Sequence, residues 1–242
     1  MSVESKMTRR AFVLAGGLWG ASMLAACGGS AEEPAAVEPE PETEEAEAEQ
    51  TAEPEATPEQ GSEPTGEASP TNVLVAFYSR ADENYADGGK EWLEVGHTKV
   101  MAGYIAEALG ADTYEIVPIE PYPEGYDECC DVAAQEQQDD ARPAIAGELP
   151  DVTPYDVVFI GCPIWWGSEP MIIRTFVEGV SLAGKTIVPF TTHGGSGLGS
   201  VPGNLQAMIP DATFLEAHAV AGTAVDGSRD EVVAWVTGMQ LA

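Results

Sequence analysis

Basic residues are scarce in this chain of 242 residues, which has 10 lysines and arginines against 41 aspartates and glutamates. A formal net charge of -31 cannot neutralise a polyphosphate backbone, which excludes a general nucleic-acid binder. Cysteines are also few. Four scattered cysteines exclude a disulfide-stapled mini-scaffold and a paired Cys-x-x-Cys zinc site. With 44% apolar residues, folding must come from burial of a hydrophobic core.

No apolar run in the N-terminal segment is long enough for a membrane-spanning helix. The stretch Ala11–Ala26 has 16 residues, whereas a bilayer needs roughly 20. It follows a basic start and leads to Leu24-Ala25-Ala26-Cys27, so residues 1–27 have the layout of an export signal. Leu24–Cys27 resembles the bacterial lipobox, which implies that Cys27 is lipidated; an ordinary signal peptide is the alternative. Thr8–Leu14 resembles the twin-arginine export motif, which serves proteins exported already folded.

Residues 28–70 contain 14 glutamates, no basic residue and no apolar periodicity. Such a segment buries too little apolar surface to order itself, so we expect a disordered acidic Glu/Pro/Ala tether. An acidic docking tail for a basic partner is the alternative. Residues 71–242 keep 26 acidic and 7 basic residues, a net charge of -19, and have the size of one domain.

From Thr71 onward, short apolar runs alternate with amphipathic stretches, which predicts an α/β fold with a doubly wound parallel sheet. The expected strands are Val73–Tyr78, Thr113–Ile119, Asp156–Cys162, Thr186–Thr191 and Thr213–Val220. The expected helices are Thr98–Leu109, Ile172–Val180, Val201–Ile209 and Asp230–Met239. The segment Glu124–Gly147 is polar and reads as part helix, part loop.

Ligands bind such sheets at the carboxyl ends of the strands, so the loops there decide function. The first loop begins with Ser79 and Arg80, continues through an inserted segment, Ala81–Val95, and ends at His97 and Thr98, where a helix starts. Hydroxyls and free N–H groups in that position suit a single phosphate, although an ordinary helix cap is the alternative. Neither Gly-x-x-x-x-Gly-Lys-Ser/Thr nor Gly-x-Gly-x-x-Gly follows the strand, which disfavours nucleoside triphosphates and tightly bound NAD.

Two further loops have an unusual composition. Pro163–Gly167 contains adjacent tryptophans, which suit a flat heteroaromatic ring unless both simply cover the core. The loop after Thr191 is rich in glycine, so its backbone could approach a ligand closely, unless it is only a flexible turn. One phosphate site, one aromatic wall and one glycine-rich wall at the same edge predict a pocket for FMN.

These loops resemble those of the flavodoxin family, and more narrowly of flavodoxin-like lipoproteins of bacterial envelopes. The resemblance implies a five-stranded sheet in the order 2-1-3-4-5 with helices on both faces. It also implies a phosphate site, two ring-flanking walls and noncovalent FMN. The phosphate contacts would be Ser79, Arg80, His97 and Thr98. One wall would be Pro163, Ile164, Trp165, Trp166 and Gly167, and the other Thr192, His193, Gly194, Gly195, Ser196 and Gly197.

The chain departs from the family pattern in its phosphate loop. About 15 residues separate Arg80 from Gly96, and His97 stands where the family has Asn. The chain after the last strand is short, as in short-chain flavodoxins. A flavin-free surface binding module on the same fold therefore stays open.

Other reactive-looking residues have simpler interpretations. Gly194–Leu198 lacks the final glycine of a nucleophile elbow, and the three histidines have no ligand spacing, so neither a serine hydrolase nor a metal site is expected. Cys129 and Cys130 could form a redox dithiol, but no Cys-x-x-Cys spacing exists and a vicinal disulfide is strained. Cys162 reads as a small buried side chain.

We therefore expect an extracytoplasmic electron carrier, lipid-anchored to the membrane at the cell envelope and acting as a monomer. Its negative charge predicts a low flavin potential and weak, salt-sensitive docking to a redox partner protein that the sequence does not identify. An FMN-dependent NAD(P)H:quinone or nitro reductase is the alternative, and it would oxidise NAD(P)H with a soluble acceptor.

Overall fold

The computed structural model describes residues 71–241. The predicted signal peptide (1–27, with Cys27) and tether (28–70) lie outside these residues. Within the described part, none of the helices has the length and apolar character needed to cross a membrane.

Strands and helices alternate along the chain as the hydrophobic pattern predicts. The main sheet consists of β1 (Val73–Phe77), β4 (Asp112–Glu115), β5 (Val157–Pro163), β6 (Thr186–His193), β7 (Thr213–Phe214) and β8 (His218–Ala221). The helices are α1 (His97–Leu109), α2 (Tyr126–Gln138), α3 (Met171–Gly179), α4 (Val201–Met208) and α5 (Arg229–Thr237), with a short 3-10 helix, η1 (Gly222–Gly227). The polar segment 124–147 thus contains α2.

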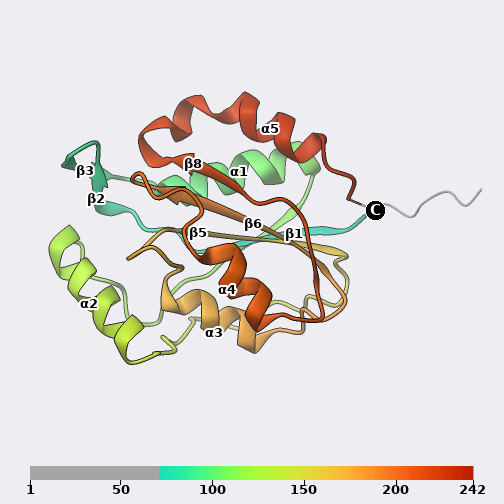
Figure 1. Cartoon of the computed structure of the whole chain (residues 1–242), viewed down its shortest axis with the longest axis horizontal. Helices are drawn as coiled ribbons and strands as arrows, with labels where there is room; N and C mark the ends of the chain where they lie inside the picture. The colour runs from blue at the N-terminus through green and yellow to red at the C-terminus, as the bar shows by residue number, and fades with distance from the viewer. Residues whose placement is uncertain (1–70, 242) are drawn as a thin grey trace, which may run out of the picture. The chain divides into compact units, whose positions relative to one another are not determined.

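The sheet is parallel in the order β4-β1-β5-β6-β7, which is the predicted order 2-1-3-4-5. Helices α1 and α5 cover one face, and α3 and α4 cover the other (Figure 1). Burial on both faces explains why β1 is an unbroken apolar run with all five residues buried. The result is an α/β sandwich with two hydrophobic cores, one on each side of the sheet.

The fifth predicted strand, Thr213–Val220, is wrong as a single element, because it is divided into β7 and β8. Both parts pair with β6, but the register shifts by one residue between Ile187↔Phe214 and Phe190↔His218. The N–H of Leu215 donates to the carbonyl of Ile187 at 3.0 Å, so the N–H and C=O of Ile187 point toward this strand. In a strand these groups point to the same side at every second residue. Pro189 is the next such residue, and it has no N–H to donate. The ladder therefore breaks beside Pro189.

The excursion after β1 is a two-stranded hairpin that the hydrophobic pattern did not predict. It pairs β2 (Asp82–Ala86) with β3 (Gly89–Leu93), antiparallel. The connection is Asp87-Gly88, with φ of 39° and 87°, as a two-residue hairpin turn requires. Figure 1 shows the hairpin beyond the end of β1, on the side where α2 begins. The insertion therefore adds a wall at the carboxyl edge of the sheet.

The contact of Gly161 with Phe190 gives a test of this packing. The two residues are opposite each other in β5 and β6, and a Cβ on Gly161 would overlap the Phe190 ring. Gly161→Ala should lower the free energy of unfolding of the full-length protein by about 1–3 kcal/mol, measured by urea denaturation. Gly103→Ala, on the exposed side of α1 with open space around it, should raise it by about 0.5–1 kcal/mol. Equal effects of the two substitutions would contradict this packing.

Candidate functional site

A pocket of about 830 Å³ opens at the carboxyl ends of β1, β5 and β6. Three loops that are far apart in the sequence meet there because the strands that precede them are parallel neighbours. Thirteen of the fifteen predicted site residues line it: Arg80, His97, Thr98, Pro163, Ile164, Trp165, Trp166, Gly167, Thr192, His193, Gly194, Gly195 and Ser196.

Ser79 and Gly197 do not line the pocket. The Ser79 hydroxyl accepts a hydrogen bond from the backbone N–H of Lys99 at 3.0 Å, so it caps the first turn of α1. The Gly197 carbonyl accepts from the Thr191 hydroxyl at 3.1 Å, which closes the loop on itself. Both residues support the pocket walls from behind.

The first loop leaves several N–H donors free at the start of α1. The N–H groups of His97 and Thr98 have no acceptor among residues 71–241, as expected for the first turn of a helix. A Cβ on Gly96 would overlap the Arg80 carbonyl and the Ser79 hydroxyl, so only glycine allows this close approach. The loop therefore presents unpaired donors and a helix dipole to the pocket.

Arg80 adds a further unpaired donor. Its side chain is buried, with 7% exposure; Nη2 donates to the carbonyls of Pro123 and Glu124, each at 2.7 Å, and Nη1 donates to the carbonyl of Glu83. Its Nε is buried and has no partner among the described residues. Leaving such a donor unpaired is costly, so a charged acceptor at this place is favoured. The loop is equipped to hold an anion although the hairpin interrupts the family pattern.

The two tryptophans of the second loop differ in their surroundings. Trp165 packs edge-on against Tyr78 and Tyr122, with centroids 5.5 and 4.9 Å apart, and it covers the core. Trp166 is 64% exposed, has a φ of 50°, and donates its indole N–H to the Cys130 carbonyl at 2.9 Å. That backbone conformation is strained for a bulky residue. Most of the Trp166 side chain is therefore open at the pocket wall.

The third loop fixes the state of His193. The Nδ1 atom of His193 accepts the N–H of Gly195 at 2.9 Å, so the neutral ring carries its proton on Nε2. Partial burial lowers the pKa of His193 below its ordinary value, which keeps the ring neutral at pH 7. The loop therefore offers the imidazole N–H of His193 as a donor to a ligand, while the N–H of Gly195 is already bonded to His193.

The comparisons with known proteins agree with this geometry. The family model for Flavodoxin matches residues 92–239. A protein from Bacteroides uniformis described as a flavoprotein is 30% identical, covering 70% of this chain and 99% of that one with a TM-score of 0.56. The chain belongs to the flavodoxin family.

Two other solved structures are similar to this flavodoxin-family chain. One is a protein from Bacteroides eggerthii described as a flavoprotein, which is 34% identical over 67% of this chain and 98% of that one, with a TM-score of 0.51. The other is a flavoprotein from Lactobacillus acidophilus in complex with FMN, which is 20% identical over 65% and 97% of the two chains, with a TM-score of 0.49. None of the curated proteins compared with the chain matches it.

The sequence reasoning missed the wall formed by the hairpin and α2. The additional lining residues are Asn84, Tyr85, Tyr126, Asp127, Cys129, Cys130, Asp131, Ala133 and Gly222. Asp87-Gly88 between two short runs is a hairpin signal that could have predicted part of it. No local signal in the sequence predicts that α2 lies beside the pocket, since its position depends on how the helix packs against the rest of the domain. The hairpin is joined to α2 by Lys90, whose Nζ lies 2.8 Å from Asp127.

The cysteines on this wall are free thiols. No disulfide joins Cys129, Cys130 or Cys162. Burial raises the pKa of the Cys129 thiol to about 11, so it stays protonated at neutral pH. Residues 71–241 contain no group of three potential ligands placed to hold a metal ion.

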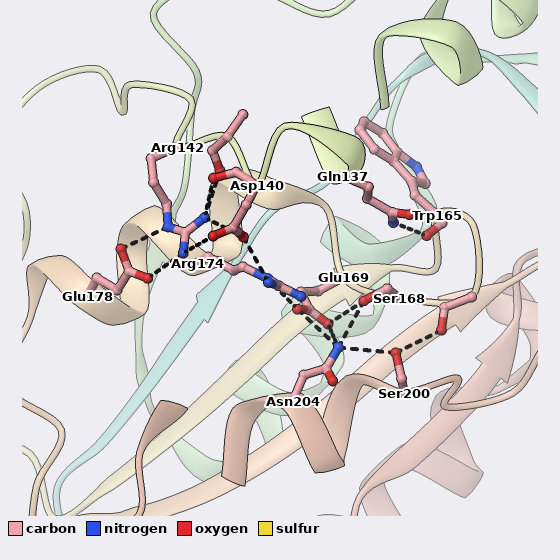
Figure 2. A network of polar contacts seen from close by, with 12 residues as sticks. Gln137, Asp140, Arg142, Trp165, Ser168, Glu169, Arg174, Glu178, Ser200 and Asn204 are labelled. Atoms are coloured by element: carbon pink, nitrogen blue, oxygen red, sulfur yellow. Dashed lines mark hydrogen bonds and ion pairs between the residues drawn. The ribbon is translucent and has the colours of Figure 1, made fainter. Parts of the chain in front are cut away.

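A buried carboxylate behind the pocket ties the two ring-flanking loops together (Figure 2). Glu169 is fully buried and accepts hydrogen bonds from Arg174 Nε at 2.9 Å and from Asn204 Nδ2 at 2.9 Å. Ser200, one turn before Asn204, donates its N–H and its hydroxyl to the carbonyl of Gly167 at 2.9 and 3.1 Å. The network thus fixes the turn that carries Trp166.

Removing the charge of Glu169 tests this network. Glu169→Gln keeps the shape of the side chain but removes its charge, so Arg174 keeps only its ion pair with the exposed Asp140. The free energy of unfolding should therefore fall by about 2–3 kcal/mol. Glu178→Gln is the matched control, because Glu178 pairs with Arg142 at the surface and should contribute less than about 1 kcal/mol. Urea denaturation of both full-length variants gives the values. Indistinguishable stabilities would show that the network does not hold the loops.

Proposed function

We propose that this chain is an FMN-dependent electron-transfer protein of the cell envelope, held at the membrane through a lipid on Cys27. FMN is the cofactor that membership in the flavodoxin family indicates. The carrier role is supported by the exposed pocket and the acidic domain. The envelope location rests on the N-terminal motifs alone.

The free donors at the start of α1 carry the proposal. The N–H groups of His97 and Thr98 and the Nε of Arg80 are unpaired, and these three residues line the same pocket. Charge-assisted hydrogen bonds to a phosphate would satisfy all three, and the helix dipole adds to them. The Thr98 hydroxyl lies 2.7 Å from that of Thr192 and orders this corner. These residues would therefore hold the FMN phosphate.

The remaining walls suit the flavin ring. The loop with Trp166 and the loop with His193 would flank it, and the Nε2–H of His193 is free to donate to a ring acceptor. When bound, FMN supplies one- and two-electron redox chemistry. The chain orients the ring, excludes water from part of it and sets the local polarity.

The surroundings of the pocket favour passing electrons to another protein. Trp166 is exposed at the pocket wall, so a partner could approach the ring closely. The net charge of -19 over residues 71–242 makes an anionic reduced flavin costlier and lowers its potential. The same charge favours docking to a basic partner face at low ionic strength.

Titration of the full-length protein with FMN tests the cofactor. We expect one-to-one quenching of flavin fluorescence and a yellow complex. Riboflavin lacks the phosphate and should bind about tenfold more weakly or worse, because charge-assisted hydrogen bonds are lost. Absence of FMN binding would favour the flavin-free binding module. Steady oxidation of NADPH with a soluble acceptor would favour the reductase.

Cys130 provides a second, independent readout of the site. This thiol is partly exposed and lines the pocket, whereas Cys129 and Cys162 are buried. Iodoacetamide should label Cys130 first among these three, as read by peptide mass mapping. Cys130 lies on α2, outside the predicted ring contacts, so its labelling should continue at FMN concentrations about ten times the Kd. Full protection of Cys130 by FMN would place the flavin on α2 instead.

A further inference from the structure

The wall formed by the hairpin and α2 adjoins both loops of the proposed ring site. A Cβ on Gly194 would lie 2.7 Å from the Tyr85 ring, so β2 touches the third loop. The indole of Trp166 is bonded to the carbonyl of Cys130, so α2 touches the second loop. The pocket is therefore continuous from the ring site to this wall, which none of the predicted flavin contacts uses.

This wall presents aromatic surface. Tyr85 and Tyr126 lie with centroids 6.3 Å apart at an angle of 37°. Tyr85 is 42% exposed and Trp166 64% exposed, so their faces are open to a ligand. Flat aromatic molecules gain most from such surfaces. The wall thus offers a place for a second flat molecule next to the flavin.

The wall also lacks any cation that is free to bind a phosphate. Arg80 is assigned to the FMN phosphate, and each of the other six lysines and arginines among residues 71–241 is bonded to a carboxylate or a carbonyl. Lys90, on β3 of the hairpin, holds Asp127 at 2.8 Å and Glu83 at 3.3 Å. The carboxylates of Asp127 and Asp131 line the pocket instead. An anionic ligand would meet like charges here.

The helix terminus at this wall is occupied as well. The N–H of Tyr126, in the first turn of α2, donates to the Glu83 carboxylate at 3.0 Å. Glu83 comes from β2, so the inserted hairpin itself fills the anion site that a helix start would provide. A dinucleotide, which carries several negative charges, would therefore find no free cation on this wall and would meet the Glu83 carboxylate at the start of α2.

We propose that this wall binds a flat aromatic redox molecule without negative charge, such as a quinone, and rejects NADH and NADPH. The inference rests on the proposed function, because it needs FMN in the ring site. A quinone bound there would accept two electrons and one proton, as a hydride, from the anionic reduced flavin and a second proton from water, and it would leave as the hydroquinone. A protein electron donor, which an electron carrier requires, would then reduce the flavin again.

Two acceptors with the same ring system test the charge selection in the FMN-loaded, full-length protein. Naphthoquinone is neutral, and naphthoquinone sulfonate carries one negative charge. Binding to the oxidised protein is measured by quenching of Tyr and Trp emission, and reoxidation of the anaerobically reduced flavin by stopped flow. At low ionic strength the neutral quinone should bind more tightly and react about tenfold faster, and high salt should remove the difference. The sulfonate is the stronger oxidant, so driving force alone predicts the opposite order.

A charge reversal on the wall separates a local effect from a general one. Asp131 is exposed, and its side chain makes no hydrogen bond or ion pair with residues 71–241. Asp131→Lys should improve binding and reaction of the sulfonate about tenfold at low ionic strength. Asp230→Lys makes the same charge change on the exposed side of α5, away from the pocket, and should leave the ratio of the two acceptors unchanged.

The outcomes distinguish this inference from the function on which it rests. Failure of the protein to bind FMN would overturn both. FMN binding together with equal use of the two quinones, or with an equal effect of both substitutions, would overturn only the inference about the wall. Rapid reduction by NADPH would overturn that inference and would also favour the reductase over the carrier.

Discussion

The parallel pairing of β5 with both β1 and β6 determines where every group of the site lies. Parallel neighbours end at the same edge, so the loops after β1, β5 and β6 meet although more than a hundred residues separate the first from the last. The ladder is held by burial on both faces and tolerates little change, as the contact of Gly161 with Phe190 illustrates. Glu169 then links two of the loops behind the pocket, so the sheet and one buried carboxylate together fix the walls.

How far the sequence predicted this arrangement depended on how local each signal was. The strands followed from apolar runs, whereas the order of the sheet and thirteen site positions followed from the resemblance of the loops to the flavodoxin family. The division of the fifth strand required knowledge that Pro189 faces it, which is a property of the assembled sheet. Ser79 and Gly197 could not be assigned from sequence, because a hydroxyl or a carbonyl serves a ligand or the backbone equally well. The wall from α2 depended on packing alone.

The interrupted phosphate loop also has a structural explanation. The hairpin interrupts the usual continuity between Arg80 and Gly96, yet Gly96 still packs directly on Arg80 and Ser79. Because β2 and β3 pair antiparallel, the first and last residues of the hairpin lie side by side, so the insertion does not move Gly96 away from Arg80. The helix start is thereby preserved, and the guanidinium of Arg80 ties the base of the hairpin to the segment before α2 through main-chain carbonyls.

Both ends of the described domain lie at the edge of the sheet opposite the pocket. The hydroxyl of Thr71 donates to the carbonyl of Leu241 at 2.7 Å, beside the beginning of β1 (Figure 1). A linker, tag or surface attached at either end therefore leaves the pocket mouth unobstructed. Coupled to an electrode through its first or last residues, the domain would present its pocket to the solution.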